Sequence, residues 1–301
     1  IIQSNNLIKI IPSITIKKLK LKESTHERKD IVPPKLIWPI KNEPKILAIS
    51  ELGKIGLLKW EFAGQKPGPL EQFLPSGLEN EQIINFIPLP EKKDLSLSLI
   101  SSDGKFKRIP ISEITDISNR STTILKLKDN IKLKSCFLCE ENSYLLIISN
   151  IGRIIKLKIT KTDFPCMGKL AQGTNIMKLF PGETIIEALN INEKETNELI
   201  LITNKGFFIK HDTKDLKTMT KGALGTIGIN FKNKKTNKDR VTNCFLNNKY
   251  IYIKTDKERY EKLETNQINN VELKKEKKLN IKLNENEHIE SIFSMVLPEN
   301  N

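Results

Sequence analysis

A short turn motif recurs along the chain at nearly regular intervals, and this regularity restricts the folds that the chain can adopt. The motif consists of two apolar residues, a Ser or Thr, two variable residues and a Gly, followed by an alternating stretch with basic residues. It occurs at Ser50–Gly53, Ser101–Gly104, Ser149–Gly152 and Thr203–Gly206. The four glycines lie 48 to 54 residues apart. Repetition at a period of roughly 20 to 50 residues is typical of solenoids, propellers and arrays.

Two weaker copies of the motif are found when the period is extended in each direction. Asn5 and Asn6 stand at the turn in IIQSNNLIKII, and asparagine tolerates the positive φ that such turns demand. Glu258 stands where the next glycine would fall, in YIYIKTDKERYEKL. Terminal repeats are commonly atypical. We therefore expect a single domain over residues 1–301 with six units, at about 1–45, 46–94, 95–142, 143–196, 197–248 and 249–301.

Each unit has the pattern of β-structure. In the fourth unit, the apolar run Leu145–Ser149 precedes the turn, and IIKLKI with a period of two follows it. Only short helical pieces, near 70–85 and 112–118, are indicated. Units of this length with four short strands each predict an all-β, six-bladed, propeller-like fold with four-stranded blades. A pair of β-sandwiches is the alternative fold, but it gives no reason for the period.

The segment ILKLKDNIKLK, Ile124–Lys134, predicts a hairpin in the third unit. Pairing Leu127 with Ile131 leaves a three-residue loop that ends at Asn130, which can take the left-handed conformation. In this register the flanking leucines face each other on one side and the lysines on the other. We therefore expect a hairpin with an apolar inner face and a lysine-bearing outer face.

The charge of the chain favours a polyanionic partner. Basic residues outnumber acidic residues by 50 to 36, which leaves a formal net charge of +14. A charge of this size attracts nucleic acid on electrostatic grounds. The alternative explanation is that the abundance of lysine and asparagine reflects the base composition of the genome. Arginine is rare, at positions 28, 108, 120, 153, 240 and 259 only.

Several classes of protein are disfavoured by the sequence. Four cysteines are too few for a disulfide framework in 301 residues. Cys136 and Cys139 form a C-x-x-C, but a zinc site needs two more ligands, and Cys166, Cys244 and the histidines are scattered. We therefore expect no metal site, and packed or neutral thiols in a reducing compartment. No apolar run approaches the roughly 18 residues of a membrane span. Because residue 1 is Ile and no signal peptide is visible, we expect a piece of a longer protein.

With these features, the units resemble the repeats of the C-terminal domain in the A subunit of DNA gyrase and in the A subunit of topoisomerase IV. The shared features are the Ser/Thr-x-x-Gly turn, the basic alternating strand after it, and a second element with glycines. In the fourth and fifth units this second element is FPCMGKLAQGTNIMKLFPGETI, residues 164–185, and MTKGALGTIGIN, residues 219–230. The resemblance extends from about residue 1 to 298.

The resemblance implies a six-bladed β-pinwheel, a propeller variant whose blades exchange strands, with a basic rim that binds and bends double-stranded DNA. It implies no catalytic residue and no cofactor in this segment. In this family the cleavage tyrosine lies in a preceding region, the B subunit hydrolyses ATP, and magnesium belongs to the rest of the holoenzyme. The implied partners are duplex DNA, the remainder of the A subunit, and the topoisomerase B subunit in an A2B2 complex. The implied location is the cytoplasm, in association with the nucleoid.

One family feature is missing from the first unit. Gyrase carries there a box of the form Q-[KR]-R-G-G-[KR]-G, which is associated with strong wrapping of DNA. The matching segment here is KKLKLKESTHERKDIVPP, Lys17–Pro34, and no glycine precedes Gly53. MGKLAQG, Met167–Gly173, is only a faint echo in a different unit. The resemblance is therefore to topoisomerase IV or to a divergent gyrase.

A rim that binds DNA without reading bases needs many modest phosphate contacts along an arc, and one basic strand in each unit supplies them. Arg108 and Arg153 are the strongest candidates, because arginine is rare and lies in the motif both times. For any single lysine the alternative is an ordinary solvated role. The full set of expected contacts is Lys54, Lys59, Lys105, Lys107, Arg108, Arg153, Lys156, Lys158, Lys205 and Lys210, with Arg120, Lys169 and Lys221 from the second elements.

Two other functions stay open. A protein-interaction propeller would use its lysines for solubility alone and bind through a loop-rich face. An enzyme on a propeller scaffold would need acidic, histidine or metal-binding residues converging on the central channel, and histidine is scarce. GALGTIG, Gly222–Gly228, lacks the Lys-Ser/Thr ending of a nucleotide loop. Trp38 and Trp60 are interpreted as packing residues, the turn glycines as structural, and Lys232–Arg240 as a loop between strands.

Overall fold

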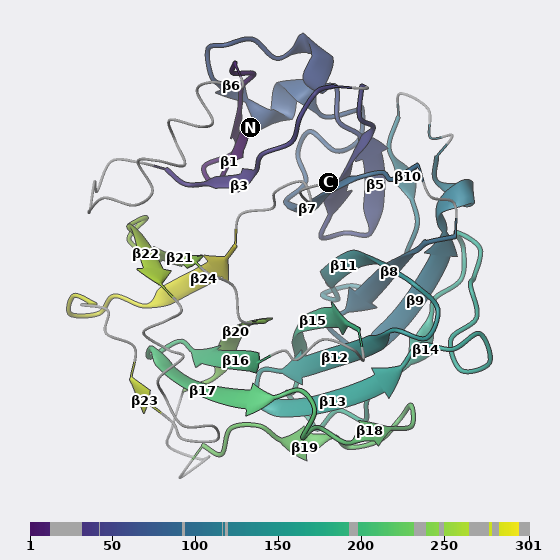
Figure 1. Cartoon of the computed structure of the whole chain (residues 1–301), viewed down its shortest axis with the longest axis vertical. Coiled ribbons are helices and arrows are strands. Elements are labelled where there is room, and N and C mark those ends of the chain that lie inside the picture. Colours follow the sequence, from purple (N-terminus) through teal and green to yellow (C-terminus); the bar gives the residue numbers. More distant parts are fainter. Residues whose placement is uncertain are drawn as a thin grey trace.

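The residues that the structure describes form a ring of six small β-sheets, or blades, in the computed structural model (Figure 1). The described residues are 1–12, 32–41, 43–91, 94–115, 117, 120–192, 198–231, 239–246, 250–264, 277–278 and 283–294. The basic segment 17–34 and the predicted loop 232–240 lie largely outside them. The predicted six-bladed, nearly all-β architecture is confirmed.

Each blade is built around the hairpin and the innermost strand of one sequence unit. The strands are β1 (Ile2–Gln3), β2 (Leu7–Ile8) and β3 (Pro34–Leu36) in blade 1; β4 (Ile46–Ser50), β5 (Lys54–Leu57) and β7 (Ile83–Pro88) in blade 2; β8 (Ser96–Ser101), β9 (Lys105–Pro110) and β11 (Leu133–Cys139) in blade 3; β12 (Tyr144–Ser149), β13 (Arg153–Lys158) and β15 (Ile185–Ile191) in blade 4; β16 (Glu198–Thr203), β17 (Phe207–Asp212) and β20 (Val241–Leu246) in blade 5; and β21 (Tyr250–Thr255), β22 (Tyr260–Glu264) and β24 (Ile289–Phe293) in blade 6.

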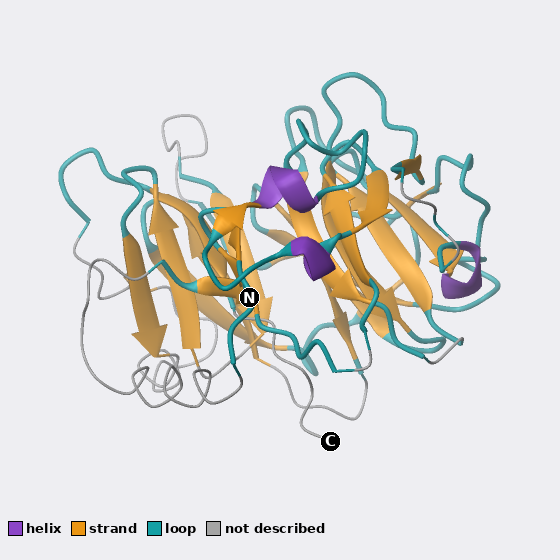
Figure 2. Ribbon diagram, turned by 90° about the horizontal axis from the view of Figure 1, so that it is seen from above, coloured by secondary structure: helices purple, strands orange, loops and turns teal. Residues whose placement is uncertain are grey.

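The innermost strands surround the centre of the ring. β7 contacts β11, β11 contacts β15, β15 contacts β20, and β20 contacts β24. Blade 6 lies next to blade 1 (Figure 1). Lys35 of β3 is close enough to Lys254 of β21 that burial, and then the charge of Lys254, lower the pKa of Lys35. In the perpendicular view of Figure 2 the sheets stand side by side, with loops at both ends of the strands.

The outermost strand of a blade is supplied by the unit that follows in the sequence. The exchanged strands are β6 (Gly68–Pro69) on β2, β10 (Thr122–Thr123) on β5, β14 (Thr174–Asn175) on β9, β18 (Thr218–Met219) and β19 (Thr226–Ile227) on β13, and β23 (Lys277–Lys278) on β17. Among the described residues, blades 1, 2, 3 and 5 have four strands, blade 4 has five and blade 6 has three. The sequence units therefore do not coincide with the blades. We call the segment between the second and the innermost strand of a unit its arm.

The hydrophobic core lies between the flat faces of neighbouring blades. Leu47 and Ile49 of blade 2, for example, pack in one cluster with Leu97 and Leu99 of blade 3. Because both faces of a blade are covered, the first strands are buried along their whole length, as in β4, β8 and β12. This double burial explains why these strands are continuous apolar runs rather than alternating ones.

The recurring motif forms the same turn in every blade. The N–H of Gly152 donates to the carbonyl of Ser149 over 2.9 Å, and the Ser149 hydroxyl accepts the N–H of Arg153 over 3.2 Å. The amide that follows the turn is bonded to the Ser or Thr hydroxyl in the same way in blades 2, 3, 5 and 6. The four turn glycines have φ between 79° and 80°, and Asn6 and Glu258 adopt φ of 60° and 56° at the two atypical ends. The predicted positions of the terminal turns are therefore confirmed.

The predicted hairpin over 124–134 is wrong in its pairing, although its turn is correct. Asn130 has a φ of 63°, and the Ile131 N–H donates to the Lys128 carbonyl over 3.1 Å. The flanking segments separate, however: β10 pairs with β5 and β11 pairs with β8. Non-local partners therefore override the local pairing.

The remaining local predictions concern short helices and two tryptophans. Among the described residues the helices are 3-10 turns, η1 (Trp60–Phe62), η2 (Leu70–Phe73) and η3 (Ile111–Glu113). Two of them fall near the predicted pieces. Trp38 and Trp60 pack against the core between blades 1 and 2, and the Trp60 indole donates to the Pro44 carbonyl over 2.8 Å. Their predicted packing role is confirmed.

Candidate nucleic-acid interface

The cations predicted to face outward separate into a buried group and an exposed group. Lys107, Arg108, Arg153 and Lys210 are between 1% and 6% exposed. The expectation that these four project from the rim is wrong. Each lies on the second strand of its blade, and the three in blades 3 and 4 also contact the arm of the following unit. Their partners are within the protein.

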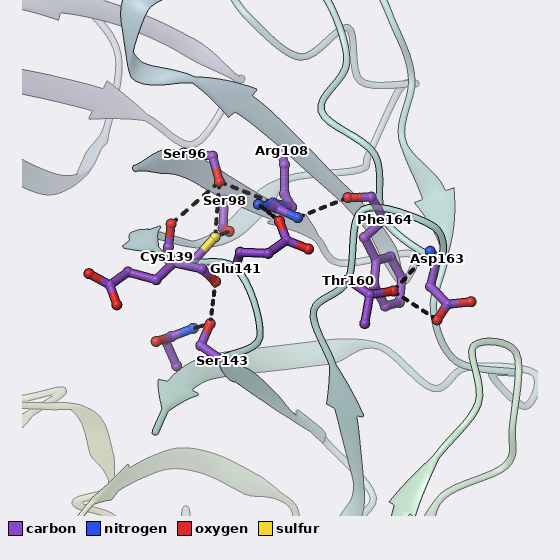
Figure 3. A network of polar contacts seen from close by, with 11 residues as sticks. Ser96, Ser98, Arg108, Cys139, Glu141, Ser143, Thr160, Asp163 and Phe164 are labelled. Carbon is purple, nitrogen blue, oxygen red and sulfur yellow. Dashed lines mark hydrogen bonds and ion pairs between the residues drawn. The ribbon is translucent and has the colours of Figure 1, made fainter. Parts of the chain in front are cut away.

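Arg108 lies in a buried polar network, in which each of its three guanidinium nitrogens donates a hydrogen bond (Figure 3). Its Nε donates to Ser96 Oγ over 3.0 Å, and its Nη2 contacts Glu141 Oε2 over 3.1 Å. Its Nη1 donates to the carbonyl of Phe164 over 3.0 Å. Phe164 lies in the arm of the fourth unit, which crosses to blade 3. Arg108 of blade 3 therefore hydrogen-bonds this arm to its own blade. The network also contains Cys139, whose Sγ accepts the Ser98 hydroxyl over 2.9 Å.

Arg153 has an equivalent role one blade further along. Its guanidinium forms an ion pair with the buried Glu183 and donates to the carbonyls of Leu224 and Lys178, the latter over 2.8 Å. The Phe180 ring lies 4.1 Å from the guanidinium carbon, within the range of a cation–π contact. These contacts join the arms of two consecutive units, because Lys178 belongs to one and Leu224 to the next.

The buried ammonium groups of Lys107 and Lys210 also have hydrogen-bond partners within the protein. Lys107 Nζ donates to the carbonyl of Ile124 over 2.6 Å and to that of Lys169 over 2.7 Å. Lys210 Nζ pairs with both carboxylate oxygens of Glu198, at 2.9 and 3.0 Å. Burial lowers the pKa of Lys107 from its usual 10.5 to about 8. Lys107 therefore connects two arms through hydrogen bonds that a neutral amine can also donate.

The lowered pKa of Lys107 predicts a pH dependence of stability. Between about pH 8 and 10.5 the unfolded chain keeps the Lys107 proton and the folded chain releases it. The contribution of this group to the free energy of unfolding should therefore rise with pH across this window. Urea unfolding of the protein and of K107Q at pH 7.5, 8.5 and 9.5 would measure it. The stability difference between the two proteins should grow in favour of the wild type as pH rises, and a constant difference would contradict the assignment.

The nine other predicted cations are half-exposed or exposed. Lys54 pairs with Glu81, and Lys156 Nζ donates to the Thr213 carbonyl over 2.9 Å. Lys221 Nζ contacts the Asp163 carbonyl over 3.2 Å. The exposed members are Arg120, Lys158, Lys205 and Lys221, and the half-exposed members are Lys54, Lys59, Lys105, Lys156 and Lys169.

Further exposed lysines lie on the arms and were not predicted from the sequence. They are Lys66, Lys126, Lys128, Lys132, Lys161, Lys178, Lys214 and Lys217. The prediction favoured the strand after each turn, which would lie outermost if each blade ended with its own hairpin. In the fold, the arms and their exchanged strands lie outside this strand and occupy the periphery (Figure 1). Exposed lysines therefore lie on the arms as well as on the second strands.

The four cysteines, all in the described part of the chain, form no disulfide. Cys136, Cys139 and Cys244 are buried, and burial raises the pKa of Cys136 and Cys244. Among the described residues, no group of three or more His, Cys, Asp or Glu side chains is placed to hold a metal ion. The helices within these same ranges are too short to span a bilayer.

Comparisons with known proteins agree with this architecture. Residues 96–140, 143–192 and 197–248 each match the family model described as "DNA gyrase C-terminal domain, beta-propeller". These ranges are the third, fourth and fifth units. The third, fourth and fifth units of the chain therefore belong to the family of DNA gyrase A C-terminal β-propeller domains. The match in three successive units agrees with the repeats found in the sequence.

Similar proteins of known name are A subunits of DNA gyrase and of DNA topoisomerase 4. The chain is 24% identical over 179 residues to the DNA topoisomerase 4 A subunit of Synechocystis sp., covering 55% of this chain and 19% of the relative. It is 27% identical over 199 residues to the DNA gyrase A subunit of Clostridium acetobutylicum, covering 64% of this chain and 22% of the relative. The chain thus spans about a fifth of the length of these relatives.

Solved structures show the same fold. The C-terminal domain of DNA topoisomerase IV superposes with a TM-score of 0.79 at 15% identity, covering 97% of this chain and 91% of that one. The C-terminal domain of DNA gyrase A superposes with a TM-score of 0.69 at 16% identity, covering 87% and 85%. The chain therefore shares its fold with these two C-terminal domains.

Proposed function

We propose that this domain binds duplex DNA without sequence preference and bends it around its outer rim. The observation that carries the proposal is the series of exposed cations on the arms of successive blades. A cation of this kind neutralises a phosphate and releases counterions, but reads no base. Bending a duplex over a few helical turns costs several kcal/mol, at most about 10. Many modest contacts along an arc can offset that cost.

The family suggests a place for this activity in a larger enzyme. As the C-terminal part of an A subunit, the domain would present DNA to the cleavage region of the same polypeptide. The topoisomerase B subunit, in an A2B2 complex in the cytoplasm, would supply ATP hydrolysis, with magnesium bound outside this domain. The domain itself would contribute no catalytic group and no cofactor.

Salt dependence tests the binding proposal. Fluorescence anisotropy of a labelled duplex of random sequence would give the affinity of the full 301-residue chain. If roughly six phosphates are neutralised, the affinity should fall about a thousandfold between about 50 and 200 mM salt. An affinity that does not change over this range would contradict the proposal. The alternative, a protein-interaction propeller with lysines for solubility only, predicts no retention of DNA in a gel shift.

A further inference from the structure

The first residue after the turn is a cation in four blades, and in three of them a carboxylate neutralises it. Arg153 pairs with Glu183 in blade 4, and Arg259 pairs with Glu287 at 2.9 Å in blade 6. Lys54 pairs with Glu81 in blade 2. Each acidic residue lies two positions before the innermost strand of its own blade. The ion pair is therefore a repeated element of the fold.

Blade 3 has the same turn before its innermost strand, but without an acidic residue at the corresponding position. The N–H of Glu81 bonds to the Leu78 carbonyl, that of Glu183 to Phe180, and that of Glu287 to Asn284, each over 3.0 to 3.1 Å. In blade 3 the same turn is made by the N–H of Ile131 and the carbonyl of Lys128 over 3.1 Å. Ile131 also lies two positions before its innermost strand, β11. Ile131 thus stands where the other three blades have glutamate.

Lys105, the cation of blade 3, is consequently left without its carboxylate. Its ammonium contacts Gln172 Oε1 at 3.3 Å, and it forms no ion pair within the described part of the chain. The turn that brings the acid in other blades brings the exposed Lys128 here, at the position of Phe180 in blade 4. Asp129 of this turn is exposed and likewise forms no ion pair with a described residue.

The two remaining blades have no cation at this position. Leu7 occupies it in blade 1 and Phe207 in blade 5. A cation that is paired with a buried carboxylate adds little net charge to the rim, and its carboxylate repels a phosphate. A half-exposed lysine without an acid offers its full charge, and neutralising a phosphate with it releases a counterion. Of the six turn positions, all of them described, blade 3 alone combines a cation with no carboxylate.

We propose that Lys105 and Lys128 form a phosphate-binding point on blade 3 that anchors the duplex to the rim. This inference rests on the proposed DNA-binding function and adds a ranking of the blades to it. The ion-paired cations Lys54, Arg153 and Arg259 stabilise the fold, whereas the two lysines of blade 3 bind the phosphates of the DNA backbone. The exchanged strand β14, which pairs with Lys105, lies beside the anchor at the periphery.

The test restores the missing acid without altering either lysine. I131E places a carboxylate where Glu81, Glu183 and Glu287 stand, and I131Q is its uncharged control. Fluorescence anisotropy with a labelled duplex at about 100 mM salt should show that I131E binds several-fold more weakly than I131Q. The slope of log affinity against log salt concentration should correspond to about one fewer neutralised phosphate in I131E. K105Q should weaken binding by a similar factor. In the double variant K105Q/I131E, the added acid should have a smaller effect.

A matched control and a folding check make the outcome decisive. K54Q/E81Q removes the equivalent ion pair of blade 2 at constant net charge, and its affinity should stay within about twofold. Circular dichroism melts would show that I131E and I131Q are both folded; should they not be, K105Q and K128Q carry the same test. The anchor is wrong if I131E and I131Q bind DNA equally, or if K105Q binds DNA like the wild type. The proposed function stands in either case, provided that the wild type binds DNA with a steep salt dependence. A wild type that does not bind DNA would overturn both.

Discussion

G152A should lose about 2 to 5 kcal/mol of unfolding free energy, whereas G206A should lose only about 1 to 2 kcal/mol. Both glycines have a φ close to 80°, and a left-handed conformation costs an L-residue roughly 1 to 2 kcal/mol. They differ in their surroundings. A Cβ on Gly152 would lie 2.1 Å from Cγ2 and 2.9 Å from the carbonyl oxygen of Ile229. A Cβ on Gly206 would meet nothing closer than 3.8 Å.

The difference between these variants measures the close approach of an arm to the turn. Ile229 belongs to the arm of the fifth unit, and its N–H and that of Gly228 both bond to the Gly152 carbonyl. Overpacking in such a contact typically costs about 1 to 3 kcal/mol beyond the backbone term. Urea denaturation at neutral pH would give both values. Equal losses for the two variants would show that the arm can move away from the turn at no cost.

E183Q should destabilise the domain by about 3 kcal/mol at pH 7. The Glu183 carboxylate is fully buried, pairs with Arg153, and accepts the Phe180 N–H over 2.9 Å. Removing one member of a buried pair leaves the other as an uncompensated charge, which typically costs about 3 to 5 kcal/mol. The amide retains part of the hydrogen bonding, so a value at the lower end is expected. Chemical denaturation of the wild type and of E183Q measures the effect.

The pH dependence of this effect provides a second check. Burial acts to raise the pKa of Glu183, but the hydrogen bonds from Arg153 and the Phe180 N–H outweigh it and leave the pKa below its usual 4.5. A carboxyl with a lowered folded-state pKa stabilises the fold above its unfolded-state pKa and loses this contribution as pH falls through the folded value. The difference between wild type and E183Q should therefore be constant above about pH 5.5 and shrink below about 4.5.

An exposed ion pair serves as the control for E183Q. Lys132 Nζ lies 2.8 Å from Glu51, and the lysine side chain is 47% exposed. Solvated pairs of this kind contribute about 0 to 1 kcal/mol. E51Q should therefore change the free energy of unfolding by less than about 1 kcal/mol. A loss as large as that of E183Q would mean that burial does not determine the strength of these pairs.

The parts of the fold that were predictable from sequence are those set by local interactions. The turn is closed by the Ser or Thr carbonyl and hydroxyl within five residues, so its motif is sufficient to locate it. Even Glu258, which is not a glycine, was placed correctly by the period. The left-handed Asn130 was likewise predicted, because its conformation depends only on its own turn.

The parts that were not predictable depend on strand exchange. β10 and β11 flank the Asn130 turn, yet each pairs with a strand of an earlier segment, and no local pattern specifies this choice. The burial of Arg108 and Arg153 has the same origin, because Phe164 and Leu224 reach them from arms 56 and 71 residues away. Among the predicted contacts, the exposed or half-exposed cations remain predictions as DNA ligands.

Strand exchange also determines how the domain can gain or lose parts. A chain that ends at residue 248, the boundary of the fifth sequence unit, would lack blade 6. It would also lack β23, so the edge of β17 at Phe207 and Phe208 in blade 5 would be unpaired. An unpaired edge of this kind invites association with other chains. A change in the number of repeats therefore damages the neighbour that remains, unless the junction falls beyond a donated strand. Removing the last repeat therefore also takes the outermost strand from the blade before it.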